Sequence, residues 1–144
     1  MKHILCTVLT FATAIAAFAA DAPDNNNALQ GTWSPIEAEL GGQAMPAAVL
    51  KSISLKLENG KYEVAIAGSM DRGTYTVDSA AEPKGMTITG TEGPNNGKTF
   101  PAIFEIKGDT LRICYDLSGM KRPTEFKSVP GTRLYLVTYS RSKQ

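Results

Sequence analysis

Hydrophobic and polar residues alternate with a period of two along most of the chain, which is typical of β-strands with one buried face. The clearest example covers residues 53–66, where two alternating runs flank Asn59 and Gly60. An Asn-Gly pair favours a two-residue hairpin turn, because both central positions of that turn need a positive φ. The turn fixes the register, pairs Leu57 with Tyr62, and gathers the apolar side chains on one face.

A second hairpin is expected over residues 99–116, with Gly108 and Asp109 as its loop. This register pairs Phe104 with Ile113, and it again separates an apolar face from a charged one.

Weaker alternation predicts further strands over residues 32–40, 73–77, 85–89 and 133–139. Residues 45–51, with Pro46 near the first helical position, predict one or two helical turns. Asp71, Arg72 and Asp78 flank one of the strands and are expected to stabilise its turns. The total is about eight strands and one short helix, which fits a closed antiparallel barrel or a sandwich. No crossover helices separate the strands, so a parallel α/β fold is excluded.

The chain has 144 residues, of which 42% are hydrophobic and 20% charged. These values fit one globular domain. The formal net charge of +1 gives no reason to expect nucleic acid or an anionic membrane surface as a partner.

The start of the chain has the pattern of a secretory signal peptide. An apolar run over residues 4–18 follows a short basic start, and Ala17 and Ala19 supply the small-x-small cleavage pattern. The run is shorter than the roughly 20 apolar residues of a membrane span, which argues against the alternative of an uncleaved anchor. This export would leave no membrane span and place the protein in the periplasm or outside the cell. We therefore expect a signal peptide over residues 1–19, a flexible leader over 20–28 and a folded domain over 29–144.

Cleavage after residue 19 would change the chemistry that is available to the protein. It removes Lys2, His3 and Cys6, so the 15 Lys and Arg residues fall to 14, equal to the 14 Asp and Glu residues. The mature chain would contain no histidine and one cysteine, Cys114. Nucleophile–histidine pairs, imidazole-bound zinc and an internal disulfide are then excluded. We expect no catalytic residues, no metal and no cofactor.

Gly31-Thr32-Trp33 resembles the Gly-x-Trp signature of lipocalin-type barrels. In those barrels the Trp closes the floor and an Arg late in the chain packs over its ring. The resemblance makes Arg141 the matching residue here, and stacking of guanidinium on indole is physically favourable.

Longer segments carry a second resemblance, and they cover residues 71–78, 83–84, 93–99, 108–115 and 119–126. In this order they are similar to a lipocalin-like family of exported proteins that is abundant in planctomycete bacteria and has no established function. The similarity extends over residues 29–141. It implies a lipocalin-like, antiparallel up-and-down β-barrel of about eight strands, with one short helix after the first strand.

We expect a monomeric, non-catalytic binding protein whose partner is a small apolar molecule or another protein of the cell envelope. The interior of an eight-stranded barrel is either filled by its own side chains or holds one small ligand. The sequence leaves both the ligand carrier and the interaction module open. The inward residues that would bind a ligand are Leu55, Leu57, Tyr62, Val64, Tyr75, Ile88, Phe104, Ile113 and Tyr115.

Arg122 and Glu125 have two interpretations. They form either a polar clamp at the barrel mouth or a salt bridge that fixes a long connection, and we prefer the second. Residues 93–99 end in Gly-Lys-Thr but are interpreted as a turn loop. Their glycine spacing and the strand that follows do not match a phosphate-binding loop.

Two further features have a functional and a structural interpretation. Cys114 is either a reactive thiol or a small residue half-buried under a loop, and we prefer the second. Glu37 and Glu39 share a strand face and would serve a carboxylate-based hydrolase, but nothing in the sequence indicates the raised pKa that such a pair needs.

Overall fold

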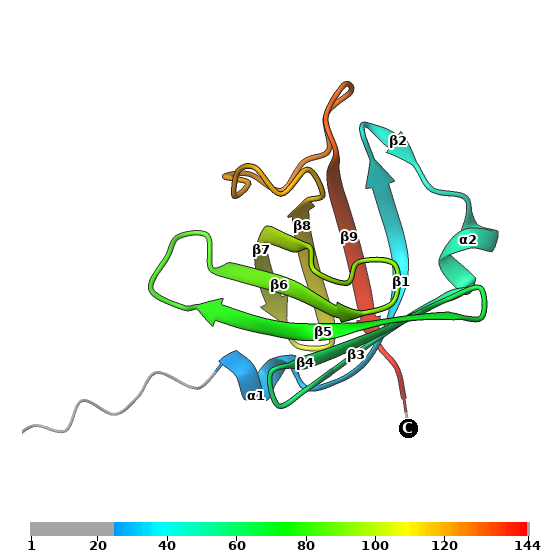
Figure 1. The fold of residues 1–144 in the computed structure, drawn as a ribbon, viewed down its shortest axis with the longest axis horizontal. Coiled ribbons are helices and arrows are strands. Elements are labelled where there is room, and N and C mark those ends of the chain that lie inside the picture. The colour runs from blue at the N-terminus through cyan, green and yellow to red at the C-terminus, as the bar shows by residue number, and fades with distance from the viewer. Residues whose placement is uncertain (1–24, 144) are drawn as a thin grey trace, which may run out of the picture.

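Eight antiparallel strands close into a barrel in the computed structural model, which describes residues 25–143 (Figure 1). The barrel strands are β1 (Gly31–Leu40), β3 (Ile53–Glu58), β4 (Lys61–Ile66), β5 (Ser69–Asp78), β6 (Gly85–Glu92), β7 (Thr99–Lys107), β8 (Thr110–Asp116) and β9 (Leu134–Arg141). Each strand pairs with the next along the chain, and β1 closes the barrel by pairing with β9. The predicted all-β, up-and-down barrel is therefore confirmed. The expected signal peptide over residues 1–19 lies outside the described residues.

Three short elements accompany the barrel. Strand β2 (Gln43–Ala44) pairs with the end of β1, and α2 (Ala47–Lys51) forms the expected helical turn before β3. Helix α1 (Asn25–Leu29) includes residues that the sequence analysis assigned to the flexible leader. Its last residue, Leu29, belongs to the expected folded domain and is 0% exposed, so α1 ends in the barrel core. None of the helices between residues 25 and 143 has the length and apolar character needed to cross a membrane.

Both hairpins predicted from the alternation are confirmed, and each has the predicted register. Leu57 pairs with Tyr62 across β3 and β4, and Phe104 pairs with Ile113 across β7 and β8. The turn residue Asn59 has a φ of 50°, and Gly60, which follows it, has a φ of 77°. The Asn-Gly pair thus supplies the backbone conformation that a two-residue turn requires.

Strand β5 is longer than the alternation indicated. It begins at Ser69, so Asp71 and Arg72 lie inside the strand and the prediction that they stabilise a turn is wrong. Asp71 takes an inward position that the alternation of apolar residues did not indicate, because Asp71 is charged and Gly73, between Asp71 and Tyr75, has no side chain. At the other end of the strand, a carboxylate oxygen of Asp78 accepts a hydrogen bond from the Ala80 N–H at 3.1 Å, which fits its expected role in a turn.

The Trp33 side chain closes one end of the barrel. Its ring is 0% exposed, and its indole N–H donates to the Leu29 carbonyl at 2.8 Å. The Arg141 guanidinium lies over this ring and donates to the carbonyls of Gln30 at 2.6 Å and Ala28 at 2.8 Å. The last strand is thereby connected to the segment that precedes the first.

The close approach of Arg141 requires a glycine at position 31. Gly31 has a φ of 133°, and an added Cβ would lie 2.8 Å from an Arg141 guanidinium nitrogen. A side chain there would strain the backbone and displace the guanidinium from Trp33.

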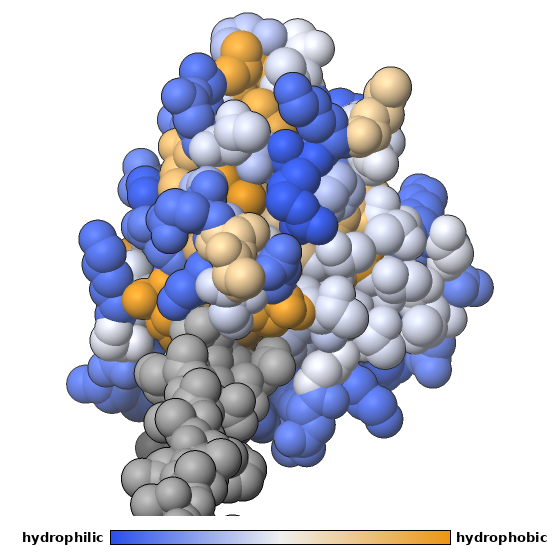
Figure 2. All heavy atoms as spheres, turned by 90° about the vertical axis from the view of Figure 1, so that its left-hand side faces the viewer, coloured by the Kyte–Doolittle hydropathy of each residue, from blue (hydrophilic) through white to orange (hydrophobic). Residues whose placement is uncertain are grey.

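The connection between β8 and β9, residues 117–133, packs on the outer face of the barrel (gold to orange in Figure 1). It covers Ile103 and Cys114, which point outward from the barrel yet are 1% and 0% exposed. Elsewhere on the side of the molecule shown in Figure 2, polar and apolar side chains are interspersed. The protein therefore has a main core inside the barrel and a smaller one under this connection.

Candidate functional site

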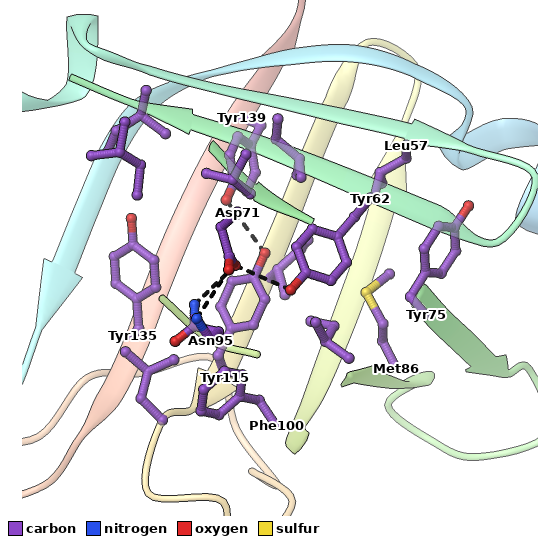
Figure 3. A pocket seen from close by; sticks show the side chains of 17 residues that line it. Leu57, Tyr62, Asp71, Tyr75, Met86, Asn95, Phe100, Tyr115, Tyr135 and Tyr139 are labelled. Carbon is purple, nitrogen blue, oxygen red and sulfur yellow. Dashed lines mark hydrogen bonds between the residues drawn. The ribbon is translucent and has the colours of Figure 1, made fainter. Parts of the chain in front are cut away.

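A cavity of about 200 Å³ lies inside the barrel (Figure 3). It opens at the end away from the Asn59-Gly60 turn, where the lining residue Ile66 is 45% exposed. Its walls come from strands β3 to β9 and from the loops at the open end. The lining residues are Ile53, Leu55, Leu57, Tyr62, Val64, Ile66, Asp71, Tyr75, Met86, Ile88, Asn95, Phe100, Ile113, Tyr115, Leu117, Tyr135 and Tyr139.

All but one of the inward residues expected from the sequence line this cavity. The exception is Phe104, which is 1% exposed and packs in the closed part of the core. The predicted inward residues that do line the cavity are Leu55, Leu57, Tyr62, Val64, Tyr75, Ile88, Ile113 and Tyr115.

Several lining residues were missed by the sequence analysis. Tyr135 and Tyr139 lie in a strand that is apolar on both faces, so its period could not assign an inward side. Asn95 belongs to the loop after β6, and a loop has no period. Asp71 is polar, and only an extension of the β5 alternation from Tyr75 back through Gly73 would have indicated its inward position.

The carboxylate of Asp71 is held by a set of hydrogen bonds at the cavity wall (Figure 3). It is 7% exposed. Its Oδ2 accepts from the Tyr62 hydroxyl at 3.1 Å and from the Asn95 side-chain amide at 2.9 Å. Its Oδ1 accepts from the Asn95 backbone N–H at 3.1 Å. Asp71 therefore fixes both an aromatic side chain of β4 and the loop after β6.

Gly73 gives the Tyr62 ring the space that this arrangement needs. The two residues pair directly across β4 and β5. A Cβ at position 73 would lie 2.6 Å from a ring carbon of Tyr62 and would also clash with the Thr89 carbonyl. Burial raises the pKa of the Tyr62 hydroxyl, and the negative charge of Asp71 and the hydrogen bond to it raise it further. Tyr62 is thus a neutral donor at physiological pH.

Three tyrosines from β8 and β9 form another part of the wall. The hydroxyls of Tyr115 and Tyr139 are 3.3 Å apart, within hydrogen-bonding distance. The rings of Tyr115 and Tyr135 stack with their centroids 5.7 Å apart. Burial is the main cause of a raised pKa at all three hydroxyls, so these side chains are uncharged. They give the cavity flat aromatic surfaces with a few polar atoms.

Arg122 and Glu125 do not pair with each other, and neither lines the cavity. Arg122 donates to the carbonyls of Met86 at 2.8 Å and Ala102 at 2.7 Å, on β6 and β7. Glu125 forms an ion pair with Lys127 at 2.8 Å. Arg122 therefore fastens the β8–β9 connection to the barrel, and it does so through backbone carbonyls instead of a salt bridge.

Cys114 and the two glutamates of β1 also lie outside the cavity lining. The Cys114 thiol is buried under the β8–β9 connection, 3.5 Å from the Lys127 carbonyl. Burial raises the pKa of this thiol, although the hydrogen bond and the charge of Arg112 oppose the shift. Glu37 and Glu39 flank the buried Ala38 and share the opposite, outward side of β1.

Comparisons with known proteins add little to this description. No protein-family model matches the chain, and no curated protein matches it. The barrel is similar to a crystal structure of a DUF4847 family protein from Bacteroides vulgatus ATCC 8482, with 14% sequence identity and a TM-score of 0.49. The similarity covers 81% of this chain and 95% of that one. At this level it carries no argument about function.

Proposed function

We propose that this protein is an exported, non-catalytic binding protein that holds a small, mostly apolar molecule inside its barrel. The observation that carries the proposal is the cavity of about 200 Å³ that the barrel's own side chains leave open. Apolar and aromatic side chains dominate its lining, with a few convergent polar groups, which is the usual composition of a small-molecule site.

The cavity volume limits the size of the ligand. An apolar cavity of about 150 Å³ in another protein binds benzene, whereas pockets for drug-sized molecules have volumes of about 300–1,000 Å³. A cavity of about 200 Å³ therefore suits a molecule the size of one substituted ring or a short alkyl chain. Fatty acids and tetrapyrroles are larger than this cavity, so the barrel would have to widen to bind them.

The sequence supports the proposed export. Residues 1–19 carry the basic start, apolar run and small-x-small pattern of a cleaved signal peptide. Similarity to an exported, lipocalin-like family of planctomycete bacteria remains a prediction from the sequence motifs. Under this proposal the protein meets its ligand in the periplasm or outside the cell.

The second candidate is a module that binds another protein of the cell envelope. Its support is limited to a few exposed apolar side chains, of which Met120 at 87% and Ile36 at 60% are the most exposed. They belong to different elements, the β8–β9 connection and β1. The cavity is the more specific feature, so we favour the ligand carrier.

Native mass spectrometry of the mature protein, purified gently from its host, tests the proposal. We expect a discrete mass excess over the polypeptide that disappears on denaturation. A bare polypeptide mass, together with a partner recovered by cross-linking in envelope extracts, would favour the interaction module instead. The same spectrum gives the mass of the mature chain, so it also tests cleavage after residue 19.

A further inference from the structure

Asp71 brings a carboxylate into a cavity that is otherwise lined by apolar and neutral polar side chains. The side chain is 7% exposed and lines the cavity. Within the described part of the chain, the lining contains no lysine or arginine, and no ion pair includes Asp71. A buried carboxylate is costly unless a positive charge compensates it, so this charge favours a cationic partner.

The hydrogen bonds to Asp71 orient the carboxylate without neutralising it. All three donors are uncharged, and they come from Tyr62 and Asn95. An ionised carboxylate offers about four acceptor positions. Oδ1 accepts only one of these bonds, from the Asn95 N–H, so it retains capacity for another donor. The orientation of the carboxylate is thus fixed, and these three hydrogen bonds are fewer than the roughly four that it can accept.

Aromatic side chains around this carboxylate suit the same kind of ligand. Tyr62 contacts Asp71 directly, and the rings of Phe100, Tyr115 and Tyr135 line the same cavity. The face of an aromatic ring attracts a cation, and the attraction is larger where water is excluded. Leu57 and Val64 complete the wall with apolar surface that suits the body of the molecule.

We propose that the cavity binds a small organic ammonium ion, with its apolar body against the barrel wall and its protonated amine paired with the Asp71 carboxylate. This inference rests on the proposed ligand-binding function and specifies the chemical class of the ligand. The ammonium group donates to Oδ1 of Asp71 and faces the aromatic rings, and the body occupies the volume between β3, β4 and β8.

Three probes of nearly the same shape test the inference: benzylamine, benzyl alcohol and benzoate. Each is titrated into the mature wild-type protein at pH 7 and followed by isothermal titration calorimetry. We expect benzylamine to bind about tenfold or more tightly than benzyl alcohol, and benzoate to bind more weakly than either, because only the ammonium forms a charge-assisted bond to Asp71. Equal affinities for the amine and the alcohol would overturn the inference and leave the carrier function standing. If none of the probes binds, the inference is overturned as well, and the native mass spectrum of the host-purified protein decides the carrier function separately.

Two matched variants locate the effect. Asp71→Asn removes the charge but keeps the size and an oxygen that accepts from Tyr62. It is expected to lose the preference for benzylamine while it still binds benzyl alcohol. Asp78→Asn makes the same change on the same strand at an exposed position and is expected to keep the preference. An Asp71→Asn protein that still prefers benzylamine tenfold would overturn the inference. If this variant does not fold, the wild-type comparison of amine and alcohol decides the question.

Discussion

The guanidinium carbon of Arg141 lies 4.2 Å from the centroid of the Trp33 ring, at the closed end of the barrel. The same side chain donates to the carbonyls of Gln30 and Ala28 and forms an ion pair with Asp109 at 3.3 Å. One residue of the last strand thus contacts the first strand, the segment before it and the β7–β8 turn. This arrangement closes the barrel floor, and it leaves the opposite end as the way into the cavity.

Arg141→Ala is expected to lower the free energy of unfolding by about 2–3 kcal/mol, because it removes two hydrogen bonds and the contact with the indole ring. Arg141→Lys restores less than half of this loss, since an ammonium cannot make the forked contact. Urea denaturation measures both effects. Arg133→Ala, at an exposed position before β9, is the control and should change stability by less than about 0.5 kcal/mol. An equal loss in the two alanine variants would contradict the role of Arg141.

Arg122 is expected to control access to Cys114. The wild-type thiol is 0% exposed, so it should react slowly with a thiol reagent such as an aromatic disulfide. Arg122→Ala removes the bonds to the Met86 and Ala102 carbonyls and should raise the reaction rate about tenfold or more, because the connection opens more often.

Lys121→Ala provides the control for this experiment, because it changes the neighbouring, exposed side chain. Its reaction rate should stay near that of the wild type. An unchanged rate in Arg122→Ala would mean that the connection is held by its other contacts.

Asp116 is expected to make stability depend on pH in the acid range. Burial alone raises the pKa of its carboxyl, but hydrogen bonds from the Ser118 hydroxyl and from the backbone of Ser118, Lys121 and Met120 outweigh this and hold the pKa below its ordinary value of 3.8. Since the pKa is lower in the folded state, the carboxylate stabilises the fold above the unfolded-state pKa. This contribution is lost as the pH falls through the folded-state pKa.

Asp116→Asn should therefore flatten the decrease in unfolding free energy between about pH 4 and pH 2. Urea denaturation at each pH measures this slope. Asp78→Asn is the control, because it removes one carboxylate at an exposed position by the same substitution. A slope in Asp116→Asn identical to that of the wild type would exclude Asp116 as the source.

The strand pattern predicted the barrel because local sequence rules and burial agree there. At Asn59 and Gly60, turn chemistry and alternation specify one register, and the structure has that register. The agreement fails at Asp71, where a charged residue occupies an inward position and is held there by hydrogen bonds from Tyr62 and Asn95. It also fails at Tyr139, because a strand with apolar residues on both faces does not reveal which face is inside.

The volume of the cavity was likewise beyond the reach of sequence patterns. Whether Leu57 and Val64 meet the opposite wall depends on the tilt and spacing of strands that are far apart in the chain. An interior with the same inward residues can be filled or hollow. The same limit explains Phe104, which faces inward as predicted but packs in the filled part of the core.

The central claim is that a small molecule binds inside the barrel, and an NMR measurement tests it most directly. Benzyl alcohol is titrated into the mature protein, and nuclear Overhauser effects are recorded between its ring protons and the protein's methyl groups. We predict contacts to the lining residues Leu57, Val64 and Ile113. Val64→Phe, which fills the cavity, should abolish them, whereas Ala65→Phe, which adds the same ring on the outward face of β4, should retain them. Contacts to surface methyl groups alone, or binding that Val64→Phe leaves unchanged, would contradict the account.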